Sequence, residues 1–187
     1  MCVNVEDLES FRPLPWCKTY LDPARYSQIP GITRKPNEHS RANTLFTRTL
    51  RSSDSIRATV SLSAIPAKPN DPITEAVTLI SLGSDLNGWS DTIHGGFLAV
   101  LLDECAGVLL GLNEGFGDTE PARVYTAYIN ISYKKPVRTP QVIVAKSKLR
   151  IKTGRKKVVA VEILDPEGAV LCNAETMFIK SNTAANL

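Results

Sequence analysis

The chain has 187 residues, of which 43% are hydrophobic and 6% aromatic, and its formal net charge is +3. A chain of this length buries enough surface to form one medium-sized domain without disulfides or a metal. The small, dispersed positive charge and the few aromatic residues argue against a nucleic-acid partner, because nucleic-acid binders concentrate basic and aromatic side chains on one surface.

Cysteine and histidine spacing gives no support for a metal site. The four cysteines form no Cys-x-x-Cys pair, and the two histidines, His39 and His94, lie far apart. We expect free thiols in a reducing compartment. The amino terminus lacks the apolar run of a secretory signal, so the expected location is cytoplasmic. The final Ala-Asn-Leu keeps the outline of a peroxisomal signal without its basic middle residue.

Residues 1–43 are expected to form a loop-rich arm on the outside of the domain. Five prolines interrupt this segment, and it sustains no hydrophobic period. A short helix is expected around Asp22–Gln28. The arm would precede a single domain over residues 44–180, and residues 181–187 would form a C-terminal tail.

Strands are expected to begin the domain. In residues 44–64 apolar residues alternate with polar ones around Ser52-Ser53-Asp54, which predicts a hairpin of two strands. The apolar run within Glu75–Gly83 predicts a third, well-buried strand.

The segment Thr92–Asn113 is predicted to form a long helix. It is apolar on nearly every side, which indicates a helix surrounded by the rest of the domain. Its longest apolar stretch, residues 97–112, contains Asp103 and Glu104 and is shorter than the roughly 20 residues that a bilayer requires. We therefore expect a core helix and no membrane partner.

Four segments with strand character follow the helix. Hairpin-length links rich in turn residues connect them, so they should form an antiparallel meander that packs on the helix. The predicted fold class is α+β, a curved antiparallel β-sheet wrapped around a long central α-helix. The four segments are Val124–Tyr133, Gln141–Ile151, Lys156–Leu164 and Ala169–Ile179.

The sequence His94-Gly95-Gly96 lies at the start of the predicted helix and is the first candidate site. The first N–H groups of a helix have no intrahelical partner, and the helix dipole favours negative charge there. Glycine lets a ligand carbonyl approach these donors closely. The Gly95 N–H is therefore a candidate oxyanion donor. His94 is expected to shape the turn by a hydrogen bond, although a general-base role stays open.

Asp103 is the second candidate. Gly95 and Asp103 are eight residues apart, or ~12 Å along one helix, so a single chain cannot direct both at one carbonyl. Two antiparallel copies across a two-fold axis would bring Gly95 of one to Asp103 of the other. The side chains at three-, four- and seven-residue spacing from Asp103 leave room for such an approach, because most are small: Gly96, Ala99, Val100, Ala106, Gly107 and Leu110. The expected assembly is a homodimer or a dimer of dimers.

Two neighbours of Asp103 are alternatives. Glu104 is turned by ~100° from Asp103 and is expected to be solvated or salt-bridged. Cys105 lies on the bulky helix face with no histidine partner, and core packing explains it better than nucleophilic chemistry.

His-Gly-Gly, followed by an aspartate nine residues after the histidine on a long apolar helix and then by a strand-rich half, resembles the hot-dog-fold acyl-CoA thioesterases of the phenylacetyl-CoA and 4-hydroxybenzoyl-CoA thioesterase superfamily. The resemblance covers roughly residues 44–180. It implies a helix wrapped by an antiparallel sheet, at least a dimer, and thioester hydrolysis at the subunit interface. It implies no cofactor, because coenzyme A is part of the substrate.

Carried over by position, the resemblance implies that the Gly95 N–H polarises the thioester carbonyl and that Asp103 of the facing subunit is base or nucleophile. Thr126 matches a hydroxyl that helps to position the attacking water. Many members have Asn or Gln six residues before the histidine. Here that position is Gly88, and Asn87 lies one residue away, so Asn87 is a weaker candidate.

Further residues are expected to bind substrate. His94 and Gly96 would contribute at the helix start. The basic turn that contains Arg155, Lys156 and Lys157 either holds phosphates of coenzyme A or keeps a hairpin soluble. A second candidate cluster consists of Lys134, Lys135 and Arg138.

The leading hypothesis is hydrolysis of a small-molecule acyl thioester, acyl-CoA or a carrier-protein-bound acyl group. The residues do not separate general-base from anhydride chemistry. Two alternatives stay open: an enoyl-thioester hydratase or dehydratase, and a non-catalytic acyl-thioester-binding module.

Overall fold

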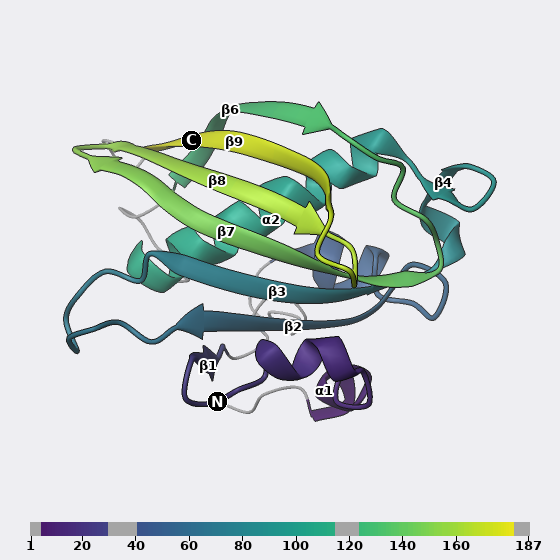
Figure 1. The fold of residues 1–187 in the computed structure, drawn as a ribbon. Helices are drawn as coiled ribbons and strands as arrows, with labels where there is room; N and C mark the ends of the chain where they lie inside the picture. Colours follow the sequence, from purple (N-terminus) through teal and green to yellow (C-terminus); the bar gives the residue numbers. More distant parts are fainter. Residues whose placement is uncertain (1–4, 30–40, 115–123, 182–187) are drawn as a thin grey trace.

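The structure is a computed structural model of the 187-residue chain, and it describes residues 5–29, 41–114 and 124–181. The predictions for Cys2, His39 and the Ala-Asn-Leu terminus fall outside these residues. Within them, seven strands form one antiparallel sheet in the order β1-β2-β3-β7-β8-β9-β6, and helix α2 crosses one face of it (Figure 1). The predicted α+β class is confirmed.

The sheet strands are β1 (Tyr26–Gln28), β2 (Ile56–Ala64), β3 (Glu75–Leu82), β6 (Val124–Tyr133), β7 (Gln141–Thr153), β8 (Lys156–Leu164) and β9 (Val170–Lys180). A separate small hairpin consists of β4 (Asn87–Trp89) and β5 (Thr92–Ile93). The α-helices are α1 (Val5–Glu9) and α2 (Gly95–Glu114), and short helical turns occupy Pro15–Thr19, Leu45–Thr49 and Ser84–Leu86.

The main core lies between α2 and the inner face of the sheet. The bulky helix face predicted from the sequence is buried there, including Leu98, Leu102 and Leu109. By length and composition alone α2 is apolar enough to cross a membrane. Here its apolar side chains pack against side chains of β3, β7, β8 and β9, as expected of a core helix.

A second core lies on the outer face of the sheet, and the N-terminal arm builds half of it. Leu8, Phe11 and Cys17 are buried there against side chains of β2, β3 and β7. The arm is therefore continuous with the domain. The helix expected around Asp22–Gln28 is wrong: Asp22 Oδ1 accepts the Ala24 N–H in a turn, and Tyr26–Gln28 form β1 because the edge of β2 supplies their hydrogen-bond partners.

The hairpin predicted in residues 44–64 is half wrong. Its second strand is β2, but Leu45–Thr49 form one helical turn instead of a strand. Phe46 is buried in the main core from this turn, so packing outweighs the alternating pattern. The Ser55 hydroxyl donates to the Leu50 carbonyl at 2.7 Å and closes the connection to β2.

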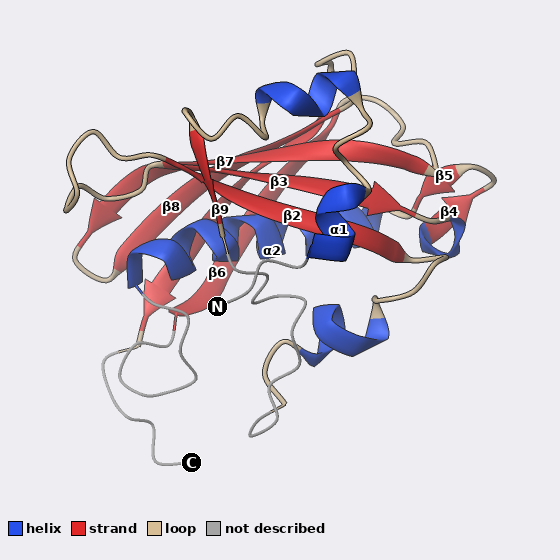
Figure 2. Ribbon diagram, turned by 90° about the horizontal axis from the view of Figure 1, so that it is seen from below, coloured by secondary structure: helices blue, strands red, loops and turns tan. Residues whose placement is uncertain are grey.

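The predicted four-stranded meander is also corrected. Strands β7, β8 and β9 are consecutive neighbours, but β7 pairs with β3 on its other side and β6 pairs with β9. The chain between Tyr133 and Gln141 therefore crosses one end of the sheet (Figure 1). Seen from below, β6 lies beside α2 (Figure 2). It is a sheet edge with no strand partner on its outer side among the described residues.

Phe11→Ala tests whether the arm belongs to the folding unit. Phe11 is fully buried, so its truncation should lower the free energy of unfolding by about 3–5 kcal/mol. Urea denaturation measures this, with Arg12→Ala as the control, because the exposed Arg12–Glu9 ion pair contributes little. Equal stability of Phe11→Ala and the wild type would show that the arm is dispensable.

Candidate active site

The first turn of α2 presents one unused amide. The Gly96 N–H donates to His94 Nδ1 at 3.0 Å, and the N–H groups of Phe97 and Leu98 donate to the His94 carbonyl. None of the hydrogen bonds within the described ranges uses the Gly95 N–H. This donor therefore remains available for a ligand oxygen at the positive end of the helix.

His94 shapes this turn, as predicted. Because Nδ1 accepts the Gly96 N–H, this nitrogen must be unprotonated. The ring lies between two glycines: a Cβ on Gly96 would come within 3.1 Å of His94 Cε1, and one on Gly88 within 3.0 Å of His94 Cδ2. A side chain at position 88 would thus crowd the imidazole, and His94 would have to shift by a few tenths of an ångström.

Asn87 is held by a different partner. The Thr139 hydroxyl donates a short hydrogen bond to Asn87 Oδ1. Asn87 also pairs with Ile93 within the β4–β5 hairpin. Its side-chain oxygen is therefore occupied by a structural contact, and no hydrogen bond among the described residues joins it to Asp103.

Asp103 and Thr126 meet, although 23 residues separate them. The Thr126 hydroxyl donates to Asp103 Oδ1 at 3.0 Å. Burial raises the pKa of the half-buried Asp103 carboxyl, and the hydrogen bond from Thr126 partly opposes that rise. Asp103 is thus a carboxylate of increased basicity, held in place by one hydroxyl.

A β-bulge in β6 makes this contact possible. The pairing of β6 with β9 shifts between Thr126 and Tyr128. In a regular strand, residues an odd number apart point to opposite faces. The bulge lets both Thr126 and Tyr133 reach α2, where the Tyr133 hydroxyl donates to the Gly95 carbonyl at 2.9 Å. Sequence reasoning did not single out Tyr133, because a bulge leaves no clear sequence signal.

The site residues form two separate groups on one helix. Gly95 and His94 lie at its start, in contact with Tyr133, whereas Asp103 lies about two turns further on, in contact with Thr126. At 1.5 Å per residue, the backbone separation is ~12 Å. One copy of the chain does not bring the Gly95 amide and the Asp103 carboxylate to one reacting atom.

Glu104 does not behave as expected. It faces a cavity of about 20 Å³ between α2 and the β2–β3 pair, lined by Phe46, Ser61 and Thr78 among others. No ion pair or hydrogen bond in the described part of the chain involves its carboxyl. Burial and the neighbouring Asp103 carboxylate raise the pKa of Glu104 to about 7. The expected salt bridge is therefore absent among the described residues, and the side chain is only partly exposed instead of fully solvated.

The neighbouring thiol is a core group, as predicted. Cys105 is buried in the main core, and burial together with the nearby Glu104 carboxylate raises the pKa of its thiol to about 12. A thiol of that pKa is scarcely ionised near neutral pH, and the thiolate is the nucleophilic form.

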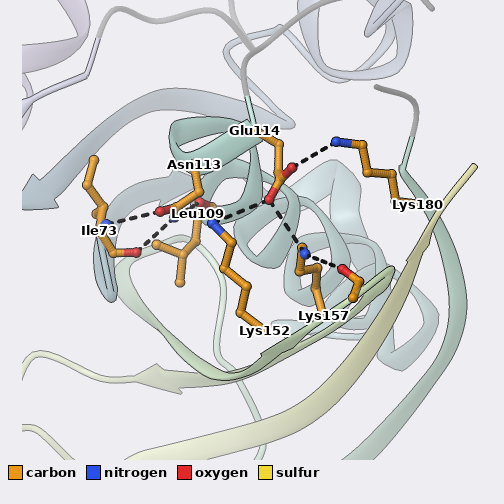
Figure 3. Close-up of polar contacts among 8 residues, drawn as sticks. Ile73, Leu109, Asn113, Glu114, Lys152, Lys157 and Lys180 are labelled. Carbon is orange, nitrogen blue, oxygen red and sulfur yellow. Dashed lines mark hydrogen bonds and ion pairs between the residues drawn. The ribbon is translucent and has the colours of Figure 1, made fainter. Parts of the chain in front are cut away.

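The basic turn has a structural role that sequence reasoning missed (Figure 3). Among the described residues, three lysines surround Glu114 at the end of α2: Lys180 at 3.2 Å, Lys152 at 3.5 Å and Lys157 at 3.7 Å. Burial alone would raise the pKa of Glu114, but the Lys180 hydrogen bond and the lysine charges outweigh it and hold the pKa low. This cluster ties β7, β8 and β9 to the helix end.

The three predicted phosphate ligands of this turn differ in availability. Lys157 is buried and also donates to the Gly154 carbonyl, so its ammonium has structural partners, and the expected phosphate contact stays a prediction. The Arg155 guanidinium donates through Nε to the Lys180 carbonyl. Lys156 is exposed.

Comparison with known proteins points to one family. Residues 91–172 match the model of the thioesterase superfamily. The acyl-coenzyme A thioesterase THEM4 of Rattus norvegicus is 35% identical over 105 residues, which are 56% of this chain and 42% of the relative. The chain spans less than half the length of the curated relatives it matches.

Solved structures show the same fold. A hypothetical thioesterase from Streptococcus pneumoniae, solved with coenzyme A, has a TM-score of 0.52 at 20% identity and covers 61% of this chain and 85% of its own. The Escherichia coli PaaI protein of the phenylacetic acid degradation operon has a TM-score of 0.50 at 14% identity, covering 57% and 72%.

The long helix, the antiparallel sheet around it and these matches together define a class. Residues 91–172 match the thioesterase superfamily, and the chain has the hot-dog fold that the sequence led us to expect. It is distantly similar to the acyl-coenzyme A thioesterase THEM4.

Glu104→Gln tests the unusual environment of this carboxyl. The unfolded chain should release the Glu104 proton near pH 4.5 and the folded chain near pH 7. The folded state binds more protons between those values, so its free energy of unfolding should fall as the pH rises through them. Urea unfolding across this range should show a smaller fall in Glu104→Gln.

The matched control is Glu162→Gln, which changes an exposed glutamate on β8 and should leave the fall in stability intact. Identical pH profiles for the wild type and Glu104→Gln would show that the Glu104 carboxyl is well solvated.

Proposed function

We propose that this protein is a thioester hydrolase that acts on acyl-CoA or on carrier-protein-bound acyl groups. The observation that carries the proposal is the Asp103 carboxylate, which is half-buried, raised in pKa and oriented by the Thr126 hydroxyl. The thioesterase superfamily match and the distant relationship to an acyl-coenzyme A thioesterase support it.

Asp103 supplies the attacking group. Because burial favours its protonated form, its ionised form is a stronger base than an ordinary carboxylate. It either removes a proton from water or attacks the thioester carbon directly to form an anhydride. The departing thiolate needs no proton from the protein at the moment it leaves. Activity should therefore fall as the pH drops through the raised Asp103 pKa.

The Gly95 amide supplies the oxyanion donor. As the thioester carbonyl becomes tetrahedral, its oxygen gains negative charge, and a preorganised N–H at a helix start stabilises it by ~2.7–4 kcal/mol. His94 occupies the Gly96 N–H and leaves the Gly95 N–H unpaired. In this proposal His94 and Gly96 shape the substrate-binding turn, and Asn87 has at most an indirect role through Thr139.

A second copy of the chain completes each site. Of the two edges of the sheet, the β2 edge is covered, because β1 pairs with it and Asp7 Oδ2 accepts the Thr59 N–H at 3.2 Å. The ten-residue β6 edge has no strand partner in the part of the chain that the structure describes, and such an edge is a template for pairing with another strand.

Pairing of two β6 edges joins the separated groups. In an antiparallel pair centred near Ile129, the Thr126 end of one copy lies beside the Tyr133 end of the other. Thr126 contacts Asp103, and Tyr133 contacts Gly95. The Asp103 carboxylate of one protomer therefore approaches the Gly95 amide of its partner, and the two-fold axis gives two equivalent sites.

Asp103→Asn tests the catalytic carboxylate. It keeps the side-chain size and should preserve the fold and dimer, but it removes the base, so turnover should fall about 10²- to 10⁴-fold. The measurement is release of free thiol from a panel of short, long and aromatic acyl-CoA substrates. The neighbouring Glu104→Gln is the matched control and should stay within about threefold of the wild type. Wild-type thiol release by Asp103→Asn would refute the mechanism.

Mixed dimers test whether each site spans two protomers. Gly95→Pro removes the amide hydrogen, and proline is tolerated at the first position of a helix. Gly95→Pro and Asp103→Asn should each be inactive alone. In a mixed dimer one site carries both changes and the other neither. Co-expression of equal amounts should therefore restore about a quarter of wild-type turnover. No recovery, with mixed dimers shown by mass spectrometry, would place both groups in one protomer.

A further inference from the structure

An exposed tryptophan stands beside the candidate site and has no assigned role. Trp89, at the end of β4, is 83% exposed, more than any other large apolar side chain in the described ranges. It makes no ring contact with another described aromatic residue. A fully hydrated indole contributes no hydrophobic free energy to folding. A ligand therefore explains this position better than packing does.

The hairpin that carries Trp89 is firmly anchored. Trp89 pairs with Thr92, and Thr92 in turn pairs with Arg138. The Ile93 N–H donates to the Val137 carbonyl at 3.0 Å, and the Thr139 N–H donates to the Asp91 carbonyl at 3.2 Å. Trp89 therefore lies on an anchored hairpin that directly precedes α2 in the chain, and the β4 hairpin projects from the molecule (Figure 1).

Arg138 shares a face with Trp89. Directly opposed residues of antiparallel strands place their side chains on the same face, and Thr92 is opposed by Trp89 on one side and by Arg138 on the other. The Arg138 guanidinium donates through Nη1 to Thr92 Oγ1 at 3.1 Å, which leaves its other N–H groups directed to solvent.

The surroundings are basic. Lys134 and Lys135 are exposed and directly follow Tyr133, which contacts Gly95. The segment 134–138 contains no acidic residue, and the hairpin segment 87–93 contains one, Asp91. An aromatic ring and a guanidinium thus share one face of the hairpin region, and two exposed lysines lie on the segment that leads to Arg138.

We propose that Trp89 and Arg138 form a nucleotide-recognition platform, in which a purine base stacks on the Trp89 indole and phosphates contact Arg138 with Lys134 and Lys135. The ligand is the nucleotide end of a coenzyme A thioester. This assignment rests on the proposed function and specifies the substrate as acyl-CoA. An indole stacks on any base, and a guanidinium matches the geometry of a phosphate. A carrier protein presents a phosphopantetheine phosphate but no base, so it leaves Trp89 unused.

The first experiment measures binding without any reaction. Adenosine 3′,5′-bisphosphate has the base and phosphates but no thioester, and calorimetric titration of the full chain gives its affinity. Trp89→Ala should weaken binding about ten-fold, whereas Trp89→Phe should retain it, because a phenyl ring still stacks. Arg138→Gln should weaken it by a similar factor. Arg150→Gln, which changes an exposed arginine on β7, is the matched control and should have no effect.

The second experiment is kinetic and compares an acyl-CoA with the S-acyl-pantetheine of the same acyl group. Trp89→Ala should raise KM for acyl-CoA about ten-fold with kcat unchanged, and it should leave the pantetheine substrate unaffected. A change in both substrates would indicate a structural defect and contradict the platform.

The outcomes separate this inference from the proposed hydrolysis. Bisphosphate binding that depends on Trp89 and Arg138 supports the platform even if no thioester is cleaved. Thioester cleavage with no bisphosphate binding, or with binding that is equal in the wild type and Trp89→Ala, overturns the platform and leaves the hydrolase intact. A loss of turnover in Trp89→Ala confined to an acyl-carrier-protein substrate also overturns it.

Discussion

The eight-residue interval between Gly95 and Asp103 on one rigid helix constrains how the candidate site can be assembled. A helix rises about 1.5 Å per residue and does not shorten, so the amide and the carboxylate stay ~12 Å apart in every copy of the chain. Strand β6 contacts both groups, because Thr126 near one end of this strand contacts Asp103 and Tyr133 at the other contacts Gly95. In the proposed dimer, the outer side of this strand pairs with a second copy of the chain.

Several features of the site depend on single glycines and on one β-bulge. His94 fits closely between Gly88 and Gly96 because neither carries a Cβ, and its ring then occupies the Gly96 amide and leaves the Gly95 amide unpaired. The bulge in β6 turns Thr126 toward α2 instead of away from it. Each of these features positions one polar group at the helix. Together they explain how an apolar core helix presents the Gly95 N–H and the Asp103 carboxylate to a ligand.

The two ends of α2 have different roles. At the start, the unpaired amide lies near an exposed tryptophan and basic side chains. At the end, Glu114 is an acidic group where the helix dipole disfavours one, and the lysines around it supply the compensating charge and join three strands to the helix. Clusters of basic residues that look alike in the sequence thus serve a structural purpose at one end of the helix and stay accessible at the other.

Local pattern by itself determined the long helix, β3, β6 to β9 with nearly their observed bounds, and the α+β class, because hydrophobic period and turn residues act over a few neighbouring positions. It also indicated His94-Gly95-Gly96 and Asp103, whereas the hot-dog fold and Thr126 came from the family resemblance. Tertiary structure alone decided that Tyr26–Gln28 form a strand, that β6 pairs with β9 instead of β7, that Lys157 is buried, and that Tyr133 touches Gly95. Those outcomes depend on strand pairing and burial between segments far apart in the chain, which no local period encodes.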